Sequence, residues 1–291
     1  MKGAVLISEN YLEFLVGKYE LSGEFEKCIQ NILLKSEEAI FKQLSKYIFV
    51  INGGELKDEI IKVFELLNLC IVITDILDDI EDKHTIKWNE DEAILLNAST
   101  ALISILVLEL NSSVIPNNEK ITTLFMRYLL KATDGQHSDL TNRIFTEEEC
   151  IKVIQAKSGS LVALACITGE ILATGSYRTG LEQCALSIGV IAQLNNDFED
   201  LLLEQKDIQA KKITLPILYL LKYQGALTKD LLHYYEGNNL EPVHISKEMI
   251  EATGLDTYMA YMQTFYRQRA ISLFSKLYPQ QNINNFLKFI L

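Results

Sequence analysis

The stretch LLNLCIVITDILDDIED, residues 66–82, decides the fold. Apolar side chains fill most of its length without the strict alternation of a strand, and acidic residues crowd its last five positions. On a helix, Asp78 and Asp82 lie one turn apart on the same face, where their charges repel unless cations neutralise them. Hard oxygen ligands suit Mg²⁺, which often bridges carboxylates to phosphate oxygens. The stretch predicts a long buried helix whose end binds metal, with a solvated acidic helix end as the alternative.

A second acidic group, Asn196-Asp-Phe-Glu-Asp200, follows the apolar run 185–194. Asn196, Asp200 and Glu204 recur every four residues and therefore share one face of a helix. Two acid-rich groups, each ending an apolar helix and more than a hundred residues apart, favour a shared metal site over chance surface charge.

Composition favours one helical domain over the whole chain, residues 1–291. Of 291 residues only 14 are Gly and 4 are Pro, and no Pro/Gly/Ser-rich linker divides the chain. Thr146-Glu-Glu-Glu149 forms a capping box that marks one helix start. Apolar spacing and turn signals predict helices at 25–51, 55–82, 88–110, 119–140, 146–174 and 178–205, loops at 111–118 and 206–211, and two or three helices within 246–291.

The charge balance excludes several classes of protein. A net charge of −12 disfavours binding to nucleic acid or to an anionic membrane surface. The N-terminal residues quickly become acidic, so a secretory signal is not expected, and we expect no apolar stretch to approach the length of a membrane span. Five cysteines lie within apolar stretches at no metal-ligand spacing, which predicts buried thiols. We expect a cytoplasmic protein without stable membrane insertion.

Three lysines are spaced so that they can receive a diphosphate: Lys87, Lys157 and Lys212. Taken singly, each has a solvated surface lysine as its alternative. Lys157-Ser-Gly159 interrupts an apolar helix, and a Ser-Gly step there can bend the segment or let a ligand approach the backbone. Gln136 and Gln193 are polar groups in apolar surroundings, with hydrogen-bonded core amides as the alternative.

In this order the motifs resemble those of the trans-isoprenyl diphosphate synthase superfamily. The matching segments are Gly53-Gly54, Asp78–Asp82 (a DDxxD motif), Gly135-Gln136, Lys157-Ser158-Gly159, Gln193 with Asn196–Asp200, and Lys212–Pro216. The resemblance implies an all-α bundle with a central active-site cavity in which the two acidic groups face each other. It also implies a homodimer.

The resemblance further implies the roles of individual residues. Three Mg²⁺ ions, present with the diphosphate bound, would link an allylic prenyl diphosphate to Asp78, Asp79, Asp82, Asn196, Asp197, Asp200 and Glu204. Lys87, Lys157, Lys212 and Gln193 would bind the diphosphate, and Asp78, Asp82, Lys157 and Lys212 would carry the catalysis. Neutralising the leaving group lowers the barrier to breaking its C–O bond.

The departures from the family concern the second substrate. Chain-elongating members bind isopentenyl diphosphate with cationic or donor groups at four positions, which here read Glu55, Asp58, Ile71 and Trp88. An anionic acceptor would meet repulsion there instead of charge-assisted hydrogen bonds. The half of the site that ionises the donor is retained, so another acceptor is expected.

Among families with this pattern, 135–142, 157–165 and 172–177 resemble ComQ-type pheromone-peptide prenyltransferases most. This implies transfer of a geranyl or farnesyl group to a Trp of a quorum-sensing precursor peptide, because a neutral indole needs no diphosphate pocket. The alternatives are a class I terpene synthase, favoured by the spacing of Asn196, Asp200 and Glu204, a short-chain prenyl diphosphate synthase, and a catalytically silent helical binding protein. The prenyl length and the roles of His84 and His137 stay open.

Overall fold

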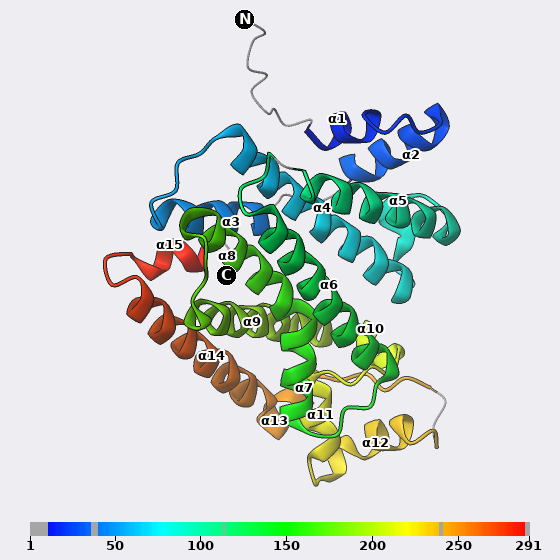
Figure 1. Ribbon diagram of the computed structural model, residues 1–291. Helices are drawn as coiled ribbons and strands as arrows, with labels where there is room; N and C mark the ends of the chain where they lie inside the picture. Colours follow the sequence, from blue (N-terminus) through cyan, green and yellow to red (C-terminus); the bar gives the residue numbers. More distant parts are fainter. Residues whose placement is uncertain (1–10, 36–39, 113, 239–240, 289–291) are drawn as a thin grey trace, which may run out of the picture. The chain divides into compact units, whose positions relative to one another are not determined.

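The computed structural model describes residues 11–35, 40–112, 114–238 and 241–288. Helices make up 78% of the structure, and no strand occurs within these ranges. Figure 1 shows helices joined by short connections. The predicted all-α class is therefore confirmed. Internal packing separates two compact units, the first of residues 1–129, 164–179 and 284–289, the second of 130–163, 180–283 and 290–291. The single domain over 1–291 stays a prediction.

The first unit is built around one long helix, α4 (Asp58–Glu81). Its residues 63–67 and 69–73 are buried without interruption, as expected of a helix that is apolar on every side. α5 (Glu92–Leu110), α3 (Ile40–Ile51) and α1 (Tyr11–Gly17) pack against it. The remaining elements of this unit are α2 (Gly23–Leu34), the 3₁₀ turn Thr85–Trp88, the first part of α6 (Asn118–Thr141), most of α8 (Ser160–Thr174) and α15 (Ile283–Leu287).

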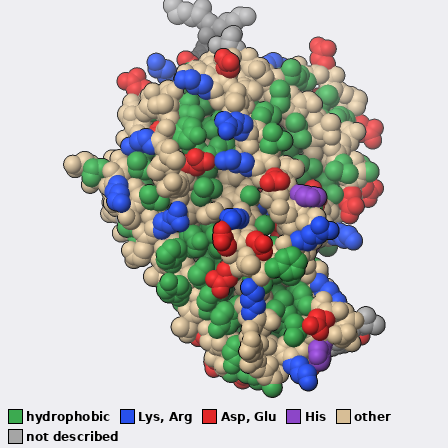
Figure 2. Space-filling model, turned by 60° about the horizontal axis from the view of Figure 1, so that its bottom comes forward, with side chains coloured by type: hydrophobic (Ala, Val, Ile, Leu, Met, Phe, Trp, Pro, Cys, Tyr) green, Lys and Arg blue, Asp and Glu red, His purple; other side chains and the backbone are tan. Residues whose placement is uncertain are grey.

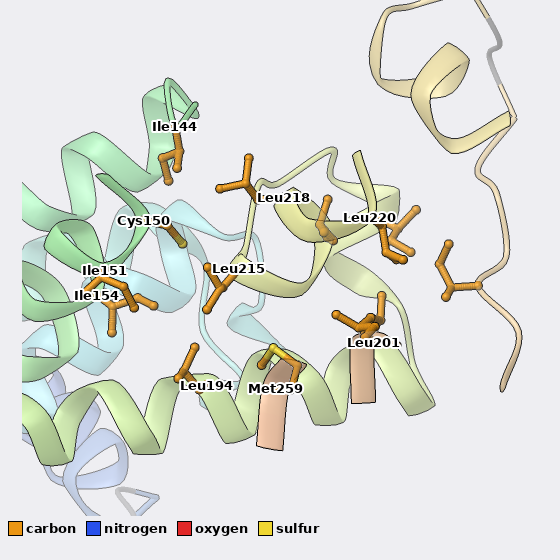
Figure 3. Packing of buried hydrophobic residues seen from close by; sticks show 14 of the residues in the cluster. Ile144, Cys150, Ile151, Ile154, Leu194, Leu201, Leu215, Leu218, Leu220 and Met259 are labelled. Carbon is orange, nitrogen blue, oxygen red and sulfur yellow. The ribbon is translucent and has the colours of Figure 1, made fainter. Parts of the chain in front are cut away.

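The second unit contains α9, whose bounds are Thr179–Leu203, and the short helices around it. α11 (Leu215–Lys222) packs against α7 (Glu147–Ile154) and α14 (Leu255–Leu277). Figure 3 shows apolar side chains of α7, α9 and α11 gathered in one core. The other elements are the π turn Gln155–Gly159, α10 (Lys206–Gln209), the 3₁₀ turn Ala226–Thr228, α12 (Lys229–Tyr235) and α13 (Lys247–Thr253).

Several helix predictions are confirmed and some are wrong in detail. The capping box is present, since Thr146 Oγ1 accepts from the Glu149 amide and Glu149 accepts from the Thr146 amide. The single helix over 25–51 is wrong, because α2 ends at Leu34 and α3 begins at Ile40. Trp88 lies in a 3₁₀ turn ahead of α5, and the predicted loop 206–211 contains the single turn of α10. Residues 247–287 form three helices, as expected.

Two apolar helical stretches, Glu92–Leu110 and Glu147–Thr174, are long enough to cross a membrane by length and composition. The expectation that no stretch approaches that length is therefore wrong. These stretches are 44% and 61% buried, and the core helices of soluble proteins pass the same test. On the face shown in Figure 2, basic side chains lie among acidic ones and form no continuous basic surface. All five cysteines are free thiols; four are buried, as predicted, whereas Cys28 is only half-buried.

Candidate active site

The first acidic group lies at the C-terminal end of α4, in the first unit. Asp78 and Asp82 are both half-buried, and the Asp82 amide donates to the Asp78 carbonyl over 2.8 Å, so the two residues follow each other one helical turn apart. Glu81, between them in sequence, is exposed. The predicted pairing of Asp78 and Asp82 on one helical face is therefore confirmed.

Asp79 has partners of its own. The chain reverses after α4 because Lys83 adopts a left-handed conformation (φ 61°) and the His84 amide donates to the Asp79 carbonyl over 2.7 Å. This reversal returns the next turn to the helix end. There, Asp79 Oδ2 accepts from Trp88 Nε1 at 2.8 Å and pairs with Lys87 Nζ at 2.9 Å.

Trp88 is fixed from both sides. Its side chain is 1% exposed, its carbonyl accepts from Lys35 Nζ at 2.5 Å, and Lys87 Nζ lies 4.7 Å from its ring centroid. A neutral indole thus occupies one of the four positions where the resemblance implied a cationic or donor group, and it supports the carboxylate of Asp79 and the ammonium of Lys87. His84, in the reversal, is exposed.

A pocket of about 60 Å³ in the second unit gathers the other predicted diphosphate-binding residues. Lys157 Nζ lies 3.2 Å and Lys212 Nζ 3.0 Å from the same oxygen, Asp139 Oδ2. The two lysine side chains are each 21% exposed and that of Asp139 is 12% exposed, so three charges share a partly desolvated space. The volume fits an ion or a few water molecules but not a prenyl chain.

A chain of hydrogen bonds leads from this pocket to the second acidic group. Ser158 Oγ donates to Gln193 Oε1 over 2.7 Å, and Gln193 Nε2 donates to Asp197 Oδ1 over 2.7 Å. Burial raises the pKa of the Asp197 carboxyl to about 7, which nearby Asp207 and Asp139 favour, whereas the Gln193 hydrogen bond and Lys212 lower it. Burial therefore favours the protonated form of Asp197.

This raised pKa predicts how stability changes with pH. Between its unfolded pKa near 4 and its folded pKa near 7, native Asp197 holds a proton that the unfolded chain has released, so stability is lost as pH rises through this window. In the Asp197→Asn variant the side-chain oxygen can still accept the hydrogen bond from Gln193, but the side chain no longer binds or releases a proton. Without divalent metal ions, this variant should gain about 2–3 kcal/mol relative to wild type between pH 5 and pH 8. Urea unfolding at both pH values measures this gain, and a difference that does not change with pH would contradict it.

Two glycines bring the helices around Lys157 close together. A Cβ on Gly135 of α6 would lie 2.4 Å from the Lys157 amide nitrogen, and one on Gly189 of α9 would lie 2.4 Å from the Gly159 Cα. The π turn 155–159 therefore packs backbone to backbone against both helices. The predicted interruption at Lys157-Ser-Gly159 is this π turn, a feature often found at functional sites.

The segment that carries Lys212 is held by side chains of the same unit. Asn142 Nδ2 donates to the Lys211 carbonyl at 2.5 Å, and Asn142 Oδ1 accepts from the Ile213 amide at 2.7 Å. Tyr235 Oη donates to the Lys212 carbonyl at 2.9 Å. The backbone on both sides of Lys212 is thus fixed, which limits the space open to its ammonium.

The other residues predicted for the second acidic group, Asn196, Asp200 and Glu204, lie along the last turns of α9 and just after it. Asn196 and Glu204 are exposed, and Glu204 pairs with Lys206. The two carboxylate oxygens of Asp200 accept from the amides of Lys206 and Asp207 at 3.2 and 3.1 Å. Asp200 therefore also caps the turn that begins α10, while each carboxylate oxygen keeps further lone pairs.

Comparison with known proteins decides the family. The model of the polyprenyl synthetase family matches residues 39–253. The chain belongs to the polyprenyl synthetase family. This family member is a prenyltransferase. It is 31% identical over 267 residues to a tryptophan prenyltransferase ComQ of Bacillus subtilis, a match that covers 87% of each chain. A second protein of that name, from Bacillus spizizenii, is 31% identical and covers 90% of this chain and 95% of its own.

Solved structures agree on the fold. A geranylgeranyl pyrophosphate synthase from Lactobacillus brevis superimposes with a TM-score of 0.80 over 97% of this chain and 95% of its own, at 15% identity. A polyprenyl synthase from Caulobacter crescentus, solved with calcium and isoprenyl diphosphate, gives 0.76 over 100% and 97%, at 16% identity. At such identities the likeness supports the all-α isoprenoid synthase fold alone.

The structure gathers the predicted residues of this family member in two places. Asp78, Asp79, Asp82 and Lys87 lie together in the first unit, and Lys157, Lys212, Gln193 and Asp197 lie together in the second. Because these places belong to different units, the convergence of the two acidic groups stays a prediction. Sequence analysis missed Asp139 as the shared partner of the lysines, although its place one turn after Gly135 on α6 carried the signal.

The acidic residues fit Mg²⁺ by their chemistry. Asp78, Asp82, Asn196, Asp200 and Glu204 offer hard oxygen donors that are half-buried or exposed. Within the described residues no three or more His, Cys, Asp or Glu side chains come together as a group that could hold a metal ion. An incomplete set suits Mg²⁺, which keeps water ligands and is usually held by one or two carboxylates together with substrate phosphates.

Proposed function

We propose that the protein transfers a geranyl or farnesyl group from its diphosphate to the indole of a Trp in a short precursor peptide for quorum sensing, with Mg²⁺, in the cytoplasm. The observation that carries the proposal is a contrast between two sets of predicted binding residues. Two lysines meet beside Asp139, whereas the position expected to bind a second diphosphate holds the buried, neutral Trp88.

The donor side would act through the lysines. Each ammonium carries three N–H donors and a full positive charge. Fixed cations beside the departing diphosphate stabilise the negative charge that it gains as the C–O bond breaks and takes both electrons. Mg²⁺ held by Asp78, Asp82, Asn196, Asp200 and Glu204 would neutralise the same charge. Asp79 pairs with Lys87, and Asp197 accepts from Gln193. These contacts favour a role for each acid in positioning its partner.

The acceptor side lacks the groups that an anion needs. Glu55 and Asp58 are exposed acids, and Ile71 is buried among the apolar residues of α4. An indole is neutral and electron-rich, so its π electrons can form the new bond to the prenyl carbon, after which the ring loses a proton. The name tryptophan prenyltransferase, carried by relatives that match along most of their length, supports this acceptor.

A class I terpene synthase is the second candidate. The regular spacing of Asn196, Asp200 and Glu204 along the end of α9 favours it. In that enzyme an alkene of the donor itself would attack the cation, and the protein would release a hydrocarbon or a terpene alcohol without any acceptor.

One incubation separates the candidates. Purified protein, Mg²⁺ and farnesyl or geranyl diphosphate are combined with isopentenyl diphosphate, with a short Trp-containing peptide, or with neither. Mass spectrometry should detect a peptide heavier by one prenyl group, and no prenyl diphosphate longer than the donor. Efficient elongation would contradict our interpretation of Glu55, Asp58, Ile71 and Trp88, and a terpene formed without peptide would select the second candidate.

A further inference from the structure

Gln136 is a buried amide that the protein leaves without partners. Its side chain is 8% exposed, and neither Nε2 nor Oε1 has a hydrogen-bond partner in the described part of the chain. Buried polar groups are almost always hydrogen-bonded, and an unsatisfied one costs stability. The sequence left open that Gln136 is a hydrogen-bonded core amide. Within the described residues the structure does not support that alternative.

A second buried glutamine of the same unit shows what a structural amide looks like here. Gln205 is 6% exposed; its Nε2 donates to the carbonyls of Leu201 and Ile245 at 3.0 and 2.8 Å, and its Oε1 accepts from the Ile245 amide at 3.0 Å. The fold can satisfy a buried carboxamide completely. Gln136 differs from Gln205 in keeping one donor group and one acceptor group that a ligand can pair with.

Gln136 does not itself line the diphosphate pocket, but it lies close to residues that do. It follows Gly135, which touches the Lys157 backbone, and it precedes Asp139, which pairs with Lys157 and Lys212, by three residues on α6. Residues three apart on a helix share a face. The amide therefore lies within one helical turn of the group that holds both lysines.

The chemistry of the amide selects among the acceptors. Gln136 presents one donor group and one acceptor group together. An alkene offers neither partner, and a diphosphate anion offers acceptors only, which would leave Oε1 unpaired. A tryptophan residue within a peptide offers both, since its indole N–H can donate to Oε1 and a main-chain carbonyl can accept from Nε2.

We propose that Gln136 binds the acceptor tryptophan, with Oε1 receiving the indole N–H and Nε2 donating to the peptide main chain. This inference rests on the proposed function. It makes Gln136 a specificity residue for a peptide acceptor. As the indole donates π electrons to the prenyl carbon its nitrogen becomes more positive, so a hydrogen bond from N–H to Oε1 strengthens during bond formation.

The test is a cycle of two proteins and two peptides. Wild type and Gln136→Leu are assayed with the Trp peptide that the wild-type protein prenylates and with the same peptide carrying 1-methyltryptophan, which lacks the N–H. The methyl group removes one of the two proposed hydrogen bonds and should lower kcat/KM for the peptide about tenfold. Gln136→Leu removes both bonds and should lower kcat/KM by at least as much. In Gln136→Leu the methyl group should cost less than about twofold, because coupled partners are not additive.

The same substitution that lowers kcat/KM is not expected to lower the unfolding temperature. Leucine removes an unsatisfied buried amide, so Gln136→Leu should unfold at the same temperature as wild type or at a higher one. Gln205→Leu, the matched control, leaves three backbone groups unpaired and should unfold several degrees lower. If the branched leucine side chain is poorly accommodated at this position, Gln136→Met repeats the cycle with a more adaptable side chain.

Two results would overturn the inference while the proposed function stands: an unchanged kcat/KM for the Trp peptide in the Gln136 variants, or independent, multiplicative losses in the cycle. Wild-type protein that leaves the Trp peptide unprenylated would overturn the proposed function and this inference together.

Discussion

Replacement of Asp78 by alanine is expected to reduce the rate of diphosphate release by at least about 10³-fold, because it removes a metal ligand worth several kcal/mol of transition-state stabilisation. Asp82→Ala should behave in the same way, since both carboxylates sit on one face at the end of α4 and are half-buried. Neither change removes apolar packing. Each relieves repulsion between two acids, so the thermal unfolding temperature should stay within a few degrees of wild type.

Glu81→Ala is the matched control for this pair. Glu81 belongs to the same acidic motif and the same last turn of α4, but its side chain is exposed. If the effect depended only on negative charge at the helix end, the three variants would lose similar activity. The metal assignment requires the Glu81 variant to stay within about threefold of wild type. Normal turnover by Asp78→Ala at saturating Mg²⁺ would refute that assignment.

Features that depend on local sequence could be predicted. The run 66–77 identifies α4 because apolar residues continue for longer than a strand would, and acids mark its end. The capping box at Thr146 fixes the start of α7, since both hydrogen bonds join residues three apart. The order of the motifs along the chain was enough to group Lys157 with Lys212 as residues of one predicted diphosphate-binding set. In these cases the necessary information lies within one helix or one motif.

Features that depend on contacts between distant segments could not be predicted. The Ser-Gly step at 158–159 indicated a bend, but the π turn is set by the close approach of Gly135 and Gly189 from two other helices. From the sequence, Trp88 was recognised only as the loss of a cationic or donor group. Its bond to Asp79 requires the chain reversal at Lys83, a left-handed residue that sequence patterns do not mark. The missing partners of Gln136 could likewise be seen only once the surrounding helices had been placed.

Replacement of Lys157 or Lys212 by methionine should each lower kcat/KM for the prenyl diphosphate by about 10²–10³-fold, the scale of one charge-stabilising donor at a developing oxyanion. Methionine retains much of the apolar stem that packs in the pocket, so the loss reports the ammonium. Inhibition by inorganic diphosphate should weaken in parallel, which a merely structural lysine would not cause. Lys152→Met is the control, because Lys152 is exposed on α7 and pairs with exposed Glu148.

The double variant tests the shared partner of the two lysines. Each single variant leaves Asp139 one cation, so the fold should persist. Loss of both leaves a carboxylate that is 12% exposed without either lysine, and removing the partners of such a buried charge costs about 3–5 kcal/mol. We therefore expect the double variant to unfold at clearly lower urea concentration than either single variant, and Asp139→Asn added to it should restore most of the loss. Stability losses that simply add, with no rescue by Asp139→Asn, would show that Asp139 is not the group that couples Lys157 to Lys212.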